Sequence, residues 1–302
     1  MDQESEVTIL GAGPAGITAA LYLIRAGFQP ILLEAQKPGG LLRQANLVEN
    51  YPGFPQGIAG AKLVNLFVEQ LNNHELSITK AVVHHVHHEK KVFLIETDQG
   101  RFHSRVIIVS TGTSPMKIRL KGSASLEGTY LFYNPFSIPR QEKKKILVIG
   151  AGDIAFDYTL TLLDMGHEVT IISRSEPSCL PLLHERVLSR GAILHTWCVP
   201  QEIIKNQTDL LVKCHQNGEE KRFRTDFILI AIGRDPNTSF LSSLLKKYFD
   251  TISDIPQTPL KGLFFAGDIV RGPYRQTGVA VGDGIRAAMM VERYLNQRAQ
   301  KP

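Results

Sequence analysis

The chain is poor in cysteine. Its 302 residues include only Cys179, Cys198 and Cys214, and no two of these form a C-x-x-C pair. Both a zinc knuckle and a local redox dithiol need such a pair, so the sequence excludes these two kinds of site among neighbouring residues. A small, odd number of cysteines is typical of reduced thiols, and we therefore expect a cytoplasmic protein.

Long apolar runs and a strong charge of one sign are also lacking. The longest stretch without a charged residue, 7–24, is interrupted by glycines and a proline, unlike a membrane span of about 20 apolar residues. Acidic residues stand near the start, where a secretory signal would be basic. We expect no membrane partner.

The net charge is +5, and the basic residues are spread along the chain apart from Lys143–Lys145. No arginine-rich arm is present, so we expect no nucleic-acid partner. Two interpretations of the mild positive charge stay open. It is either an ordinary solvated surface or a docking surface for an acidic electron carrier, such as a ferredoxin or a flavodoxin.

A segment near the start of the chain is repeated in the middle. Val7–Gly16 (VTILGAGPAG) returns as Ile146–Ala155 (ILVIGAGDIA), and in both copies another glycine follows sixteen residues after the first loop glycine. Each copy reads as strand, turn, helix and strand, followed by a hairpin and a last buried strand. We predict an α/β fold of two Rossmann-like, three-layer (ββα) dinucleotide-binding domains, with the second inserted in the first.

Local patterns give the expected elements and boundaries. Helices are predicted at 15–26 and 153–165, and antiparallel hairpins at 81–104 and 201–225. Pro115 and Pro236 follow the two closing strands, where a chain can cross between domains. The stretch 263–268 and the helix after Gly278 would return to the first domain. The predicted domains are therefore 1–113 with 238–302, and 114–237.

The first glycine loop carries a nucleotide-binding pattern. In Gly11-x-Gly13-x-x-Gly16, the first glycine permits a tight turn, the second lets a pyrophosphate approach the backbone, and the third lets helix and strand pack closely. The helix that follows would present its positive end to the phosphates. Glu34 ends the next strand, where a carboxylate accepts hydrogen bonds from an adenosine ribose.

A second loop, Gly150-x-Gly152-x-x-Ala155, has the same context but no acid at the position of Glu34. Ser173 stands there instead, followed by Arg174 and Ser175. A serine and an arginine can hold a 2′-phosphate, so the pattern favours NADP over NAD. The alternative, Arg174 as an ordinary surface arginine, stays open.

Further motifs carry a family resemblance. Gly39-Gly40, Glu49–Phe54 (ENYPGF), Gly267-Asp268, Arg275-Gln276 and Gly282–Gly284 together resemble the low-molecular-weight thioredoxin reductases, which are class II pyridine nucleotide-disulfide oxidoreductases. The resemblance spans almost the whole chain. It implies FAD in the first domain, NADPH (or NADH) as electron donor in the second, and a homodimer.

Carried over by position, the resemblance also implies roles for individual residues. The loop 11–16 and Glu34 would hold the ADP half of FAD, Asn50 and the turn 39–42 would flank the flavin ring, and Asp268 would bind the ribityl chain. Arg275 and Gln276 would approach the ring edge. The candidate residues of the first site are Gly11, Gly13, Pro14, Ala15, Gly16, Glu34, Gly40, Leu41, Leu42, Asn50, Val83, Thr111, Gly112, Gly267, Asp268, Arg275, Gln276 and Thr277. Those of the second site are Gly150, Gly152, Asp153, Ile154, Ala155, Ser173, Arg174, Ser175 and Gly233. We assign no catalytic side chain and no metal ligand.

The chain departs from the family pattern at three places. The family has a Cys-x-x-Cys and an Asp just before the second loop, where this chain has Tyr133–Phe136 and Ser137. Of the family's His-Arg-Arg-x-x-x-Arg, Ser173–Cys179 keeps only the first arginine, and Leu41 replaces a usual glutamine. These changes put nicotinamide affinity in doubt and leave room for another ligand in the second site, even a second flavin.

The sequence therefore supports several functions. The first is an FAD-dependent oxidoreductase that passes electrons from NAD(P)H through FAD to an external acceptor without a dithiol, so thioredoxin reduction is not expected. Alternatives are a ferredoxin- or flavodoxin-NADP reductase or a protein-to-protein electron relay. Relatives of the reductase type carry a longer C-terminal tail over the flavin, and this chain stops soon after Glu292–Leu295. An alternative of another class is a non-catalytic flavin-binding redox sensor or assembly module.

Two other features have a structural interpretation. His84, His85, His87 and His88 would alternate sides on a strand, which pairs 84 with 88 and 85 with 87 and gives no third metal ligand. Met289 and Met290 on the last helix are predicted to be core residues.

Overall fold

The computed structural model describes residues 2–140, 142–250, 252 and 256–299. The chain forms two compact units. Unit 1 comprises residues 1–43, 48–114 and 236–302, and unit 2 comprises 44–47 and 115–235. Two short strands, β7 (Thr113–Pro115) and β16 (Arg234–Pro236), pair with each other where the chain passes between the units.

Unit 1 is built on a mostly parallel sheet with the order β3-β2-β1-β6-β5-β4, in which β17 also pairs with β6. The second half of β6 lies between β1 and β17, both parallel to it, and its first half pairs with β5 in an antiparallel hairpin. The strands are β1 (Asp2–Leu10), β2 (Ile31–Glu34), β3 (Ile78–Lys80), β4 (Val83–Glu89), β5 (Val92–Thr97), β6 (Gly100–Val109) and β17 (Leu263–Phe265).

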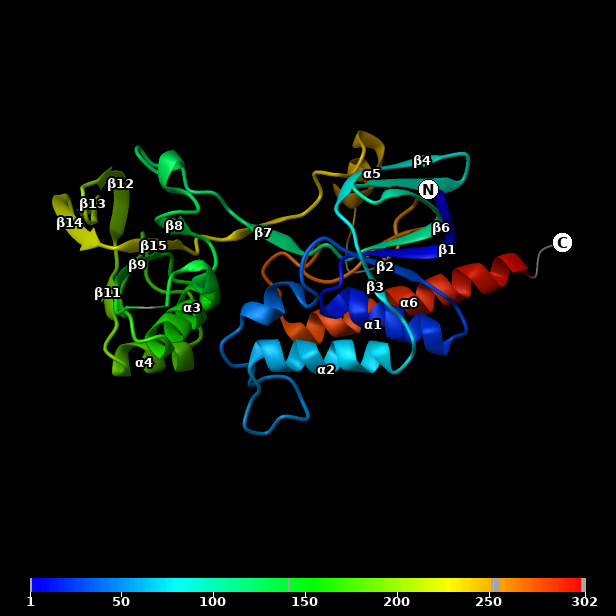
Figure 1. The fold of residues 1–302 in the computed structure, drawn as a ribbon, viewed down its shortest axis with the longest axis horizontal. Coiled ribbons are helices and arrows are strands. Elements are labelled where there is room, and N and C mark those ends of the chain that lie inside the picture. The colour runs from blue at the N-terminus through cyan, green and yellow to red at the C-terminus, as the bar shows by residue number, and fades with distance from the viewer. Residues whose placement is uncertain (1, 141, 251, 253–255, 300–302) are drawn as a thin grey trace. The chain divides into compact units, whose positions relative to one another are not determined.

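Three helices cover one side of this sheet: α1 (Pro14–Arg25), α2 (Gly60–Asn72) and α6 (Thr277–Ala299). In Figure 1, α1 (blue) lies beside α6 (orange to red), and α2 (cyan) lies next to them. A shorter helix, α5 (Ser243–Asp250), packs near β4. The three larger helices bring residues 14–25, 60–72 and 277–299 together beside one sheet.

Unit 2 has a parallel sheet with the order β11-β10-β9-β15-β8 and a separate antiparallel sheet, β12-β13-β14. The parallel strands are β8 (Leu131–Phe132), β9 (Lys145–Ile149), β10 (Glu168–Ile172), β11 (Ile193–His195) and β15 (Phe227–Ile230). The antiparallel strands are β12 (Cys198–Lys205), β13 (Leu210–Gln216) and β14 (Glu219–Thr225). Among its described residues, unit 2 has two α-helices, α3 (Asp153–Asp164) and α4 (Pro181–Ser189), and two short 3-10 turns, η2 (Ala124–Leu126) and η3 (Pro135–Ser137). Another 3-10 turn, η1 (Gly40–Gln44), lies at the end of the first segment of unit 1.

Alternation along β9 explains the three layers of unit 2. Successive side chains of a strand point to opposite faces. Ile146 and Val148 therefore join a core with the helices, whereas Leu147 and Ile149 join a second core with the antiparallel sheet. A strand buried on both faces needs a continuous apolar sequence, which the run Ile146–Ile149 supplies.

The repeated glycine sixteen residues after each loop ends a helix. Gly27, after α1, has φ +88°, and Gly166, after α3, has φ +86°. In both copies the glycine and the next residue donate hydrogen bonds back to the last turn, as Phe28 N does to Leu23 O at 3.0 Å and His167 N to Leu162 O at 3.1 Å. This is the Schellman ending, which favours glycine because of its left-handed backbone.

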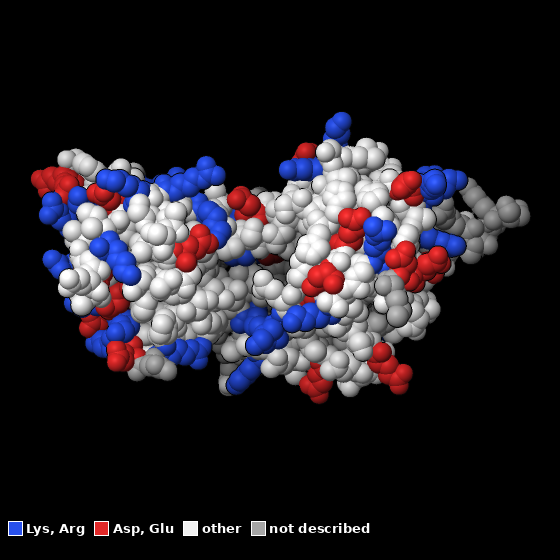
Figure 2. Space-filling view, turned by 45° about the horizontal axis from the view of Figure 1, so that its top comes forward, with Lys and Arg blue, Asp and Glu red and all other residues white. Residues whose placement is uncertain are grey.

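The structure confirms the predicted α/β class with two Rossmann-like units, the helices after both glycine loops, and both hairpins. In the structure β17 pairs with β6, and β17 and α6 belong to unit 1. On the face drawn in Figure 2, basic and acidic side chains are interspersed, in keeping with the small net charge. Among the described residues, no helix combines the length and hydrophobicity needed to cross a bilayer.

Candidate nucleotide-binding sites

The first glycine loop connects β1 to α1 with very little free space around two of its glycines. A Cβ on Gly11, whose φ is +98°, would lie 2.6 Å from the Ser110 carbonyl oxygen, and one on Gly16 would lie 1.9 Å from the Gly11 oxygen. A Cβ on Gly13 would meet nothing within 4 Å. The first and third glycines are thus required by packing, and the second borders open space at the helix N-terminus.

That helix end is suited to an anion. Gly13 is the N-cap, Pro14 is the first helical residue, and the first turn contains no acidic side chain. The first N–H groups of a helix have no partner within it and carry a partial positive charge. The open space beside Gly13 is therefore a suitable place for a pyrophosphate.

Glu34 lies beside this loop, at the carboxyl end of β2. Its carboxylate accepts hydrogen bonds from Ala12 N and Gln36 N, both at 2.8 Å, so its position is fixed from two sides. A cavity of about 450 Å³ adjoins it, lined by Glu34–Pro38, Ile78 and Lys80. Ala81 N donates to the Glu34 carbonyl oxygen at 2.9 Å. This bond brings the chain just before Val83 to the same edge of the sheet. The cavity has room for an adenosine next to the carboxylate.

The turn before η1 and the start of α6 complete the first site. Gly39 N donates to Ala12 O at 2.7 Å, which fixes the turn that leads into Gly40–Leu42 against the glycine loop. Asn50, predicted to flank the ring, donates a hydrogen bond from its Nδ2 to Oε1 of Gln276, predicted to approach the ring edge, at 2.9 Å. Thr111 and Gly112 follow β6, Gly267 and Asp268 follow β17, and Thr277 begins α6.

Asp283 on α6 holds the Gly267 turn. Its buried carboxylate accepts from Gly267 N at 3.2 Å and from Arg271 Nε at 2.6 Å. Gly284, the next residue, would place a Cβ 2.1 Å from the Ala15 carbonyl oxygen, so α6 touches the first turn of α1. Sequence reasoning assigned no role to Asp283, although it lies within the quoted motif 282–284.

Taken together, the residues of the first site fit an FAD-sized dinucleotide. The glycine loop, the fixed carboxylate with its adjacent cavity and the Gly267–Asp268 turn all belong to unit 1, and they follow β1, β2 and β17 at the carboxyl ends of parallel strands. That is the edge where doubly wound sheets bind ligands.

The second glycine loop repeats the geometry within unit 2. A Cβ on Gly150, with φ +129°, would lie 2.1 Å from the Ala231 oxygen, whereas Gly152 has only Ser178 Oγ at 3.8 Å. Gly152 is the N-cap of α3, and Ala155 is fully buried where the first loop has Gly16. Gly233 follows β15 at the same sheet edge.

The second loop has an acidic side chain, Asp153, in the first turn of its helix, where the first site has none. Asp153 places a carboxylate in the first turn of α3, where its Oδ1 accepts from Leu180 N at 2.8 Å. Ile154 is its neighbour in the same turn. The Asp153 carboxylate therefore binds the backbone just before α4. The space beside Gly152 remains open at the N-terminus of α3.

The loop after β10 contains Ser173–Ser175. Ser173 is buried, and its hydroxyl accepts from Ser175 N at 3.3 Å, whereas Arg174 is exposed. Next to them lies a pair that sequence reasoning missed. Trp197 Nε1 donates to Glu176 Oε1 at 2.8 Å, and the indole remains 52% exposed. The signal available in the sequence was that this tryptophan is the only one in the chain.

The three cysteines all belong to unit 2. Cys198 and Cys214 are fully buried between β12, β13 and the parallel sheet, and their thiols are hydrogen-bonded to each other. Burial raises the pKa of both thiols, that of Cys214 most strongly. Burial also raises the pKa of the half-buried Cys179, helped by the nearby Asp153. All three are free thiols.

The segment 133–136, which the sequence predicts at the place of the family's dithiol, forms a turn capped by a side chain. Asn134 Oδ1 accepts from Phe136 N at 2.9 Å and so caps η3. Phe136 is 43% exposed, and the Arg140 guanidinium lies 5.3 Å from its ring centre. In the segment 133–137 of unit 2, the Phe136 ring is exposed and the Asn134 side chain caps the turn.

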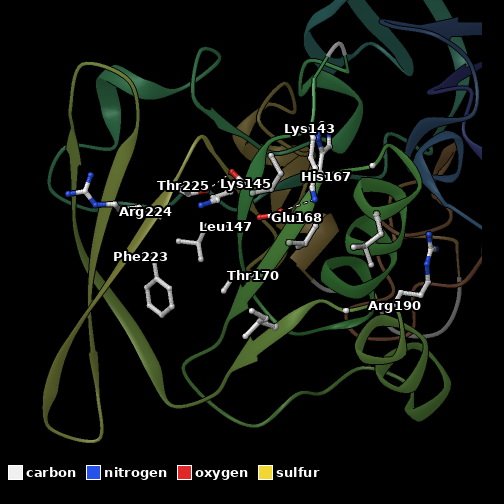
Figure 3. A pocket seen from close by; sticks show the side chains of 16 residues that line it. Lys143, Lys145, Leu147, His167, Glu168, Thr170, Arg190, Phe223, Arg224 and Thr225 are labelled. Carbon is white, nitrogen blue, oxygen red and sulfur yellow. Dashed lines mark hydrogen bonds and ion pairs between the residues drawn. The ribbon is translucent and has the colours of Figure 1, made fainter.

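A cavity of about 580 Å³ lies at the opposite end of the parallel sheet of unit 2, where β9 and β10 begin (Figure 3). Three of its cations are paired with carboxylates: Lys143 with Glu168 at 2.8 Å, Arg190 with Asp164 at 2.7 Å and Arg224 with Asp209 at 3.1 Å. Burial, with Lys144, lowers the pKa of His167, which favours its neutral form. Because nucleotides bind at the carboxyl ends of parallel strands, this cavity is separate from the predicted site.

From the sequence, the histidines of β4 and Met289 of α6 have a structural interpretation. The rings of His85 and His87 lie 5.5 Å apart on β4, as the strand alternation predicts, and no group of three or more potential metal ligands was found in the described part of the chain. The prediction that Met289 is a core residue is wrong, because its side chain is 51% exposed. The apolar pattern of α6 continues onto its outer face.

Comparison with known proteins agrees with this geometry. The sequence profile of the pyridine nucleotide-disulphide oxidoreductase family matches residues 5–284. The chain belongs to this family. It is 30% identical to a thioredoxin reductase of Escherichia coli O157:H7, over 97% of each chain, and 31% identical to thioredoxin reductase 2 of Arabidopsis thaliana, over 97% of this chain and 83% of that one.

Solved thioredoxin reductases have the same fold. That of Lactococcus lactis superposes with a TM-score of 0.89 at 28% identity, covering 97% of this chain and 99% of that chain. The thioredoxin reductase of T. acidophilum superposes with a TM-score of 0.87 at 29% identity, covering 98% of this chain and 99% of that chain. Thioredoxin reductases use FAD and NADPH, so this pyridine nucleotide-disulphide oxidoreductase is a flavoprotein oxidoreductase of the thioredoxin reductase-like type.

Proposed function

We propose that the protein transfers electrons from NADPH or NADH through FAD to an external acceptor without using a redox dithiol. The observation that carries this proposal is the placement of sulfur. The two thiols in contact, Cys198 and Cys214, are sealed inside unit 2 with raised pKa values, and the segment 133–137 contains no cysteine.

In this proposal the residues of the first site hold FAD. The N-terminus of α1 would hold the pyrophosphate, Glu34 would accept from the adenosine ribose, and the Gly267–Asp268 turn, held by Asp283, would support the ribityl chain. When bound, FAD supplies the redox chemistry, accepting two electrons from a reduced nicotinamide and releasing them to an acceptor. The N-terminus of α3 and the loop 173–175 hold the nicotinamide nucleotide.

A buried neutral thiol is a poor nucleophile, because the thiolate is the reactive form. Cys198 and Cys214 would therefore not open a disulfide substrate at neutral pH, so bound FAD would have to supply electrons to the acceptor without these thiols. Thioredoxin reduction is accordingly not the proposed activity. The net charge of +5 fits an acidic protein acceptor such as a ferredoxin or a flavodoxin.

The test is anaerobic mixing of the purified flavoprotein with NADPH and, separately, NADH. The proposal is supported by rapid bleaching of the oxidised flavin band together with turnover on an artificial acceptor. That turnover should persist in a variant that carries Cys179→Ser, Cys198→Ala and Cys214→Ala. Loss of turnover in that variant, at unchanged flavin content, contradicts it. Bleaching by dithionite but by neither nucleotide favours the non-catalytic flavin-binding module instead.

We further propose a cytoplasmic homodimer. Thioredoxin reductase homologues are typically homodimers. In this chain Ile285 and Met289 lie one turn apart on the exposed face of α6, where a second copy would cover them. The free thiols fit a reducing compartment.

A further inference from the structure

The loop that follows β10 carries two opposite charges close together. Arg174 and Glu176 are both exposed and are separated by one residue. In a Rossmann-like unit this loop faces the adenosine ribose, where NADP carries a 2′-phosphate and NAD a hydroxyl. A guanidinium attracts the phosphate, and a carboxylate repels it but accepts a hydrogen bond from a hydroxyl.

The carboxylate of Glu176 is held in place from outside its own loop. Trp197 Nε1 donates to Glu176 Oε1 at 2.8 Å. The backbone on either side of the indole is anchored as well, because Cys198 N donates to Ser173 O at 2.7 Å and Gln216 Nε2 donates to Thr196 O at 2.7 Å. The indole and the carboxylate therefore form one wall next to Ser173.

The backbone of Trp197 indicates that this arrangement is specific. Its φ is +56°, a left-handed conformation that is unfavourable for a bulky residue with a Cβ. The indole is nevertheless 52% exposed, so burial of the ring does not compensate for this conformation. An exposed aromatic face beside a ribose-binding loop is suited to stacking on a purine base.

We propose that the Trp197–Glu176 pair is the adenosine wall of the second nucleotide site, with Glu176 acting as a specificity residue that weakens binding of a 2′-phosphate against the attraction of Arg174. This inference rests on the proposed role of unit 2 in nucleotide binding. The loop has no net charge from these two side chains, so discrimination between NADPH and NADH is smaller than an arginine-rich loop would give.

The test uses the single tryptophan as its own reporter. The flavin-loaded protein is titrated with AMP and with adenosine 2′,5′-bisphosphate while Trp197 fluorescence is recorded, and calorimetry measures the same affinities independently. Glu176→Gln keeps an acceptor for the indole N–H and removes the charge. We expect the bisphosphate to bind about three- to tenfold more tightly to this variant, with AMP changed less than twofold.

Two further variants complete the experiment. Arg174→Ala should weaken the bisphosphate selectively. Glu168→Gln, which removes a paired carboxylate at the opposite end of β10, should change neither affinity. Equal effects of Glu176→Gln on both nucleotides, or calorimetric binding without any change in Trp197 fluorescence, would overturn the inference and leave the proposed function standing. No calorimetric binding of either nucleotide would overturn both.

Discussion

At the scale of single residues, each of the two glycine loops has one glycine that is not closely packed. Gly13 and Gly152 adjoin open space, whereas their neighbours Gly11 and Gly150 are closely packed. A side chain at either open position is accommodated by the fold but projects to where a pyrophosphate would lie. These positions therefore separate binding from folding.

Gly13→Leu should yield a folded protein without FAD, because the new side chain occupies the space at the N-terminus of α1. The flavin absorbance per mole of purified protein measures this loss, and circular dichroism checks the fold. Gly152→Leu is the matched control in the other unit and should retain flavin while weakening the nicotinamide nucleotide. Normal flavin retention in Gly13→Leu would contradict the assigned site.

The buried thiols give a second residue-scale prediction. In the native protein at pH 7, a thiol reagent such as Ellman's should modify Cys179 at most, because Cys198 and Cys214 are inaccessible and their pKa values are raised. All three should react once the chain is unfolded in guanidinium. Rapid reaction of two or three thiols in the native state would contradict the structure.

The same pKa shifts have a consequence for stability. Because the folded pKa of each buried thiol lies above the unfolded value of about 8.5, the thiol is neutral in both states at neutral pH, and its contribution is fully present there. As the pH rises above about 8.5, the unfolded chain ionises first and the free energy of unfolding falls. Cys214→Ala should make that fall shallower in urea titrations at pH 7 to 10.

At the scale of elements, the contact between α1 and α6 depends on one small residue. A Cβ on Gly284 would lie 2.1 Å from Ala15 O and 2.4 Å from Thr18 Oγ1, whereas a Cβ on Gly282 would meet nothing within 4 Å. Both residues belong to α6. They form a matched pair for measuring what close packing contributes.

Gly284→Ala should lower the free energy of unfolding by about 1–3 kcal/mol, because the two helices must separate to admit the methyl group. Gly282→Ala should raise it by up to about 1 kcal/mol, since alanine has the higher helix propensity. Chemical denaturation of the two variants checks both signs. Equal effects would show that the helices are not in close contact at Gly284.

Much of this architecture was predictable because its signals are local. Glycine loops, buried β-branched strands and the Asp98–Gly100 and Asn217-Gly218 turns act within a few residues, and the structure places the turns between β5 and β6 and between β13 and β14. Contacts between residues distant in sequence have no local pattern from which they could be predicted. The Trp197–Glu176 bond spans 21 positions, and the exposure of Met289 depends on which side of α6 faces α1.

At the scale of the whole molecule, the outer face of α6 determines the expected assembly. Met289→Glu would place a charge in the proposed contact between two copies, where it would lack a partner, and should yield monomers. Sedimentation velocity of the flavin-loaded protein measures this change. Glu292→Gln, on the next turn of α6, where Glu292 accepts a bond from Tyr22 within the chain, is a control that should remain dimeric.

The interleaved connectivity also dictates an order of events during synthesis. Unit 2 ends at residue 235, so from residue 115 onward its parallel sheet is assembled from one continuous stretch of chain. Unit 1 begins with β1 but still lacks β17 and α6 when unit 2 is complete. On the ribosome the inserted unit can therefore fold first. The apolar helix-facing side of the host sheet stays uncovered by α6 until residues 236–299 have been synthesised, roughly 3–13 seconds at about 5–20 residues per second. During this interval the exposed apolar surface of the nascent chain is open to aggregation.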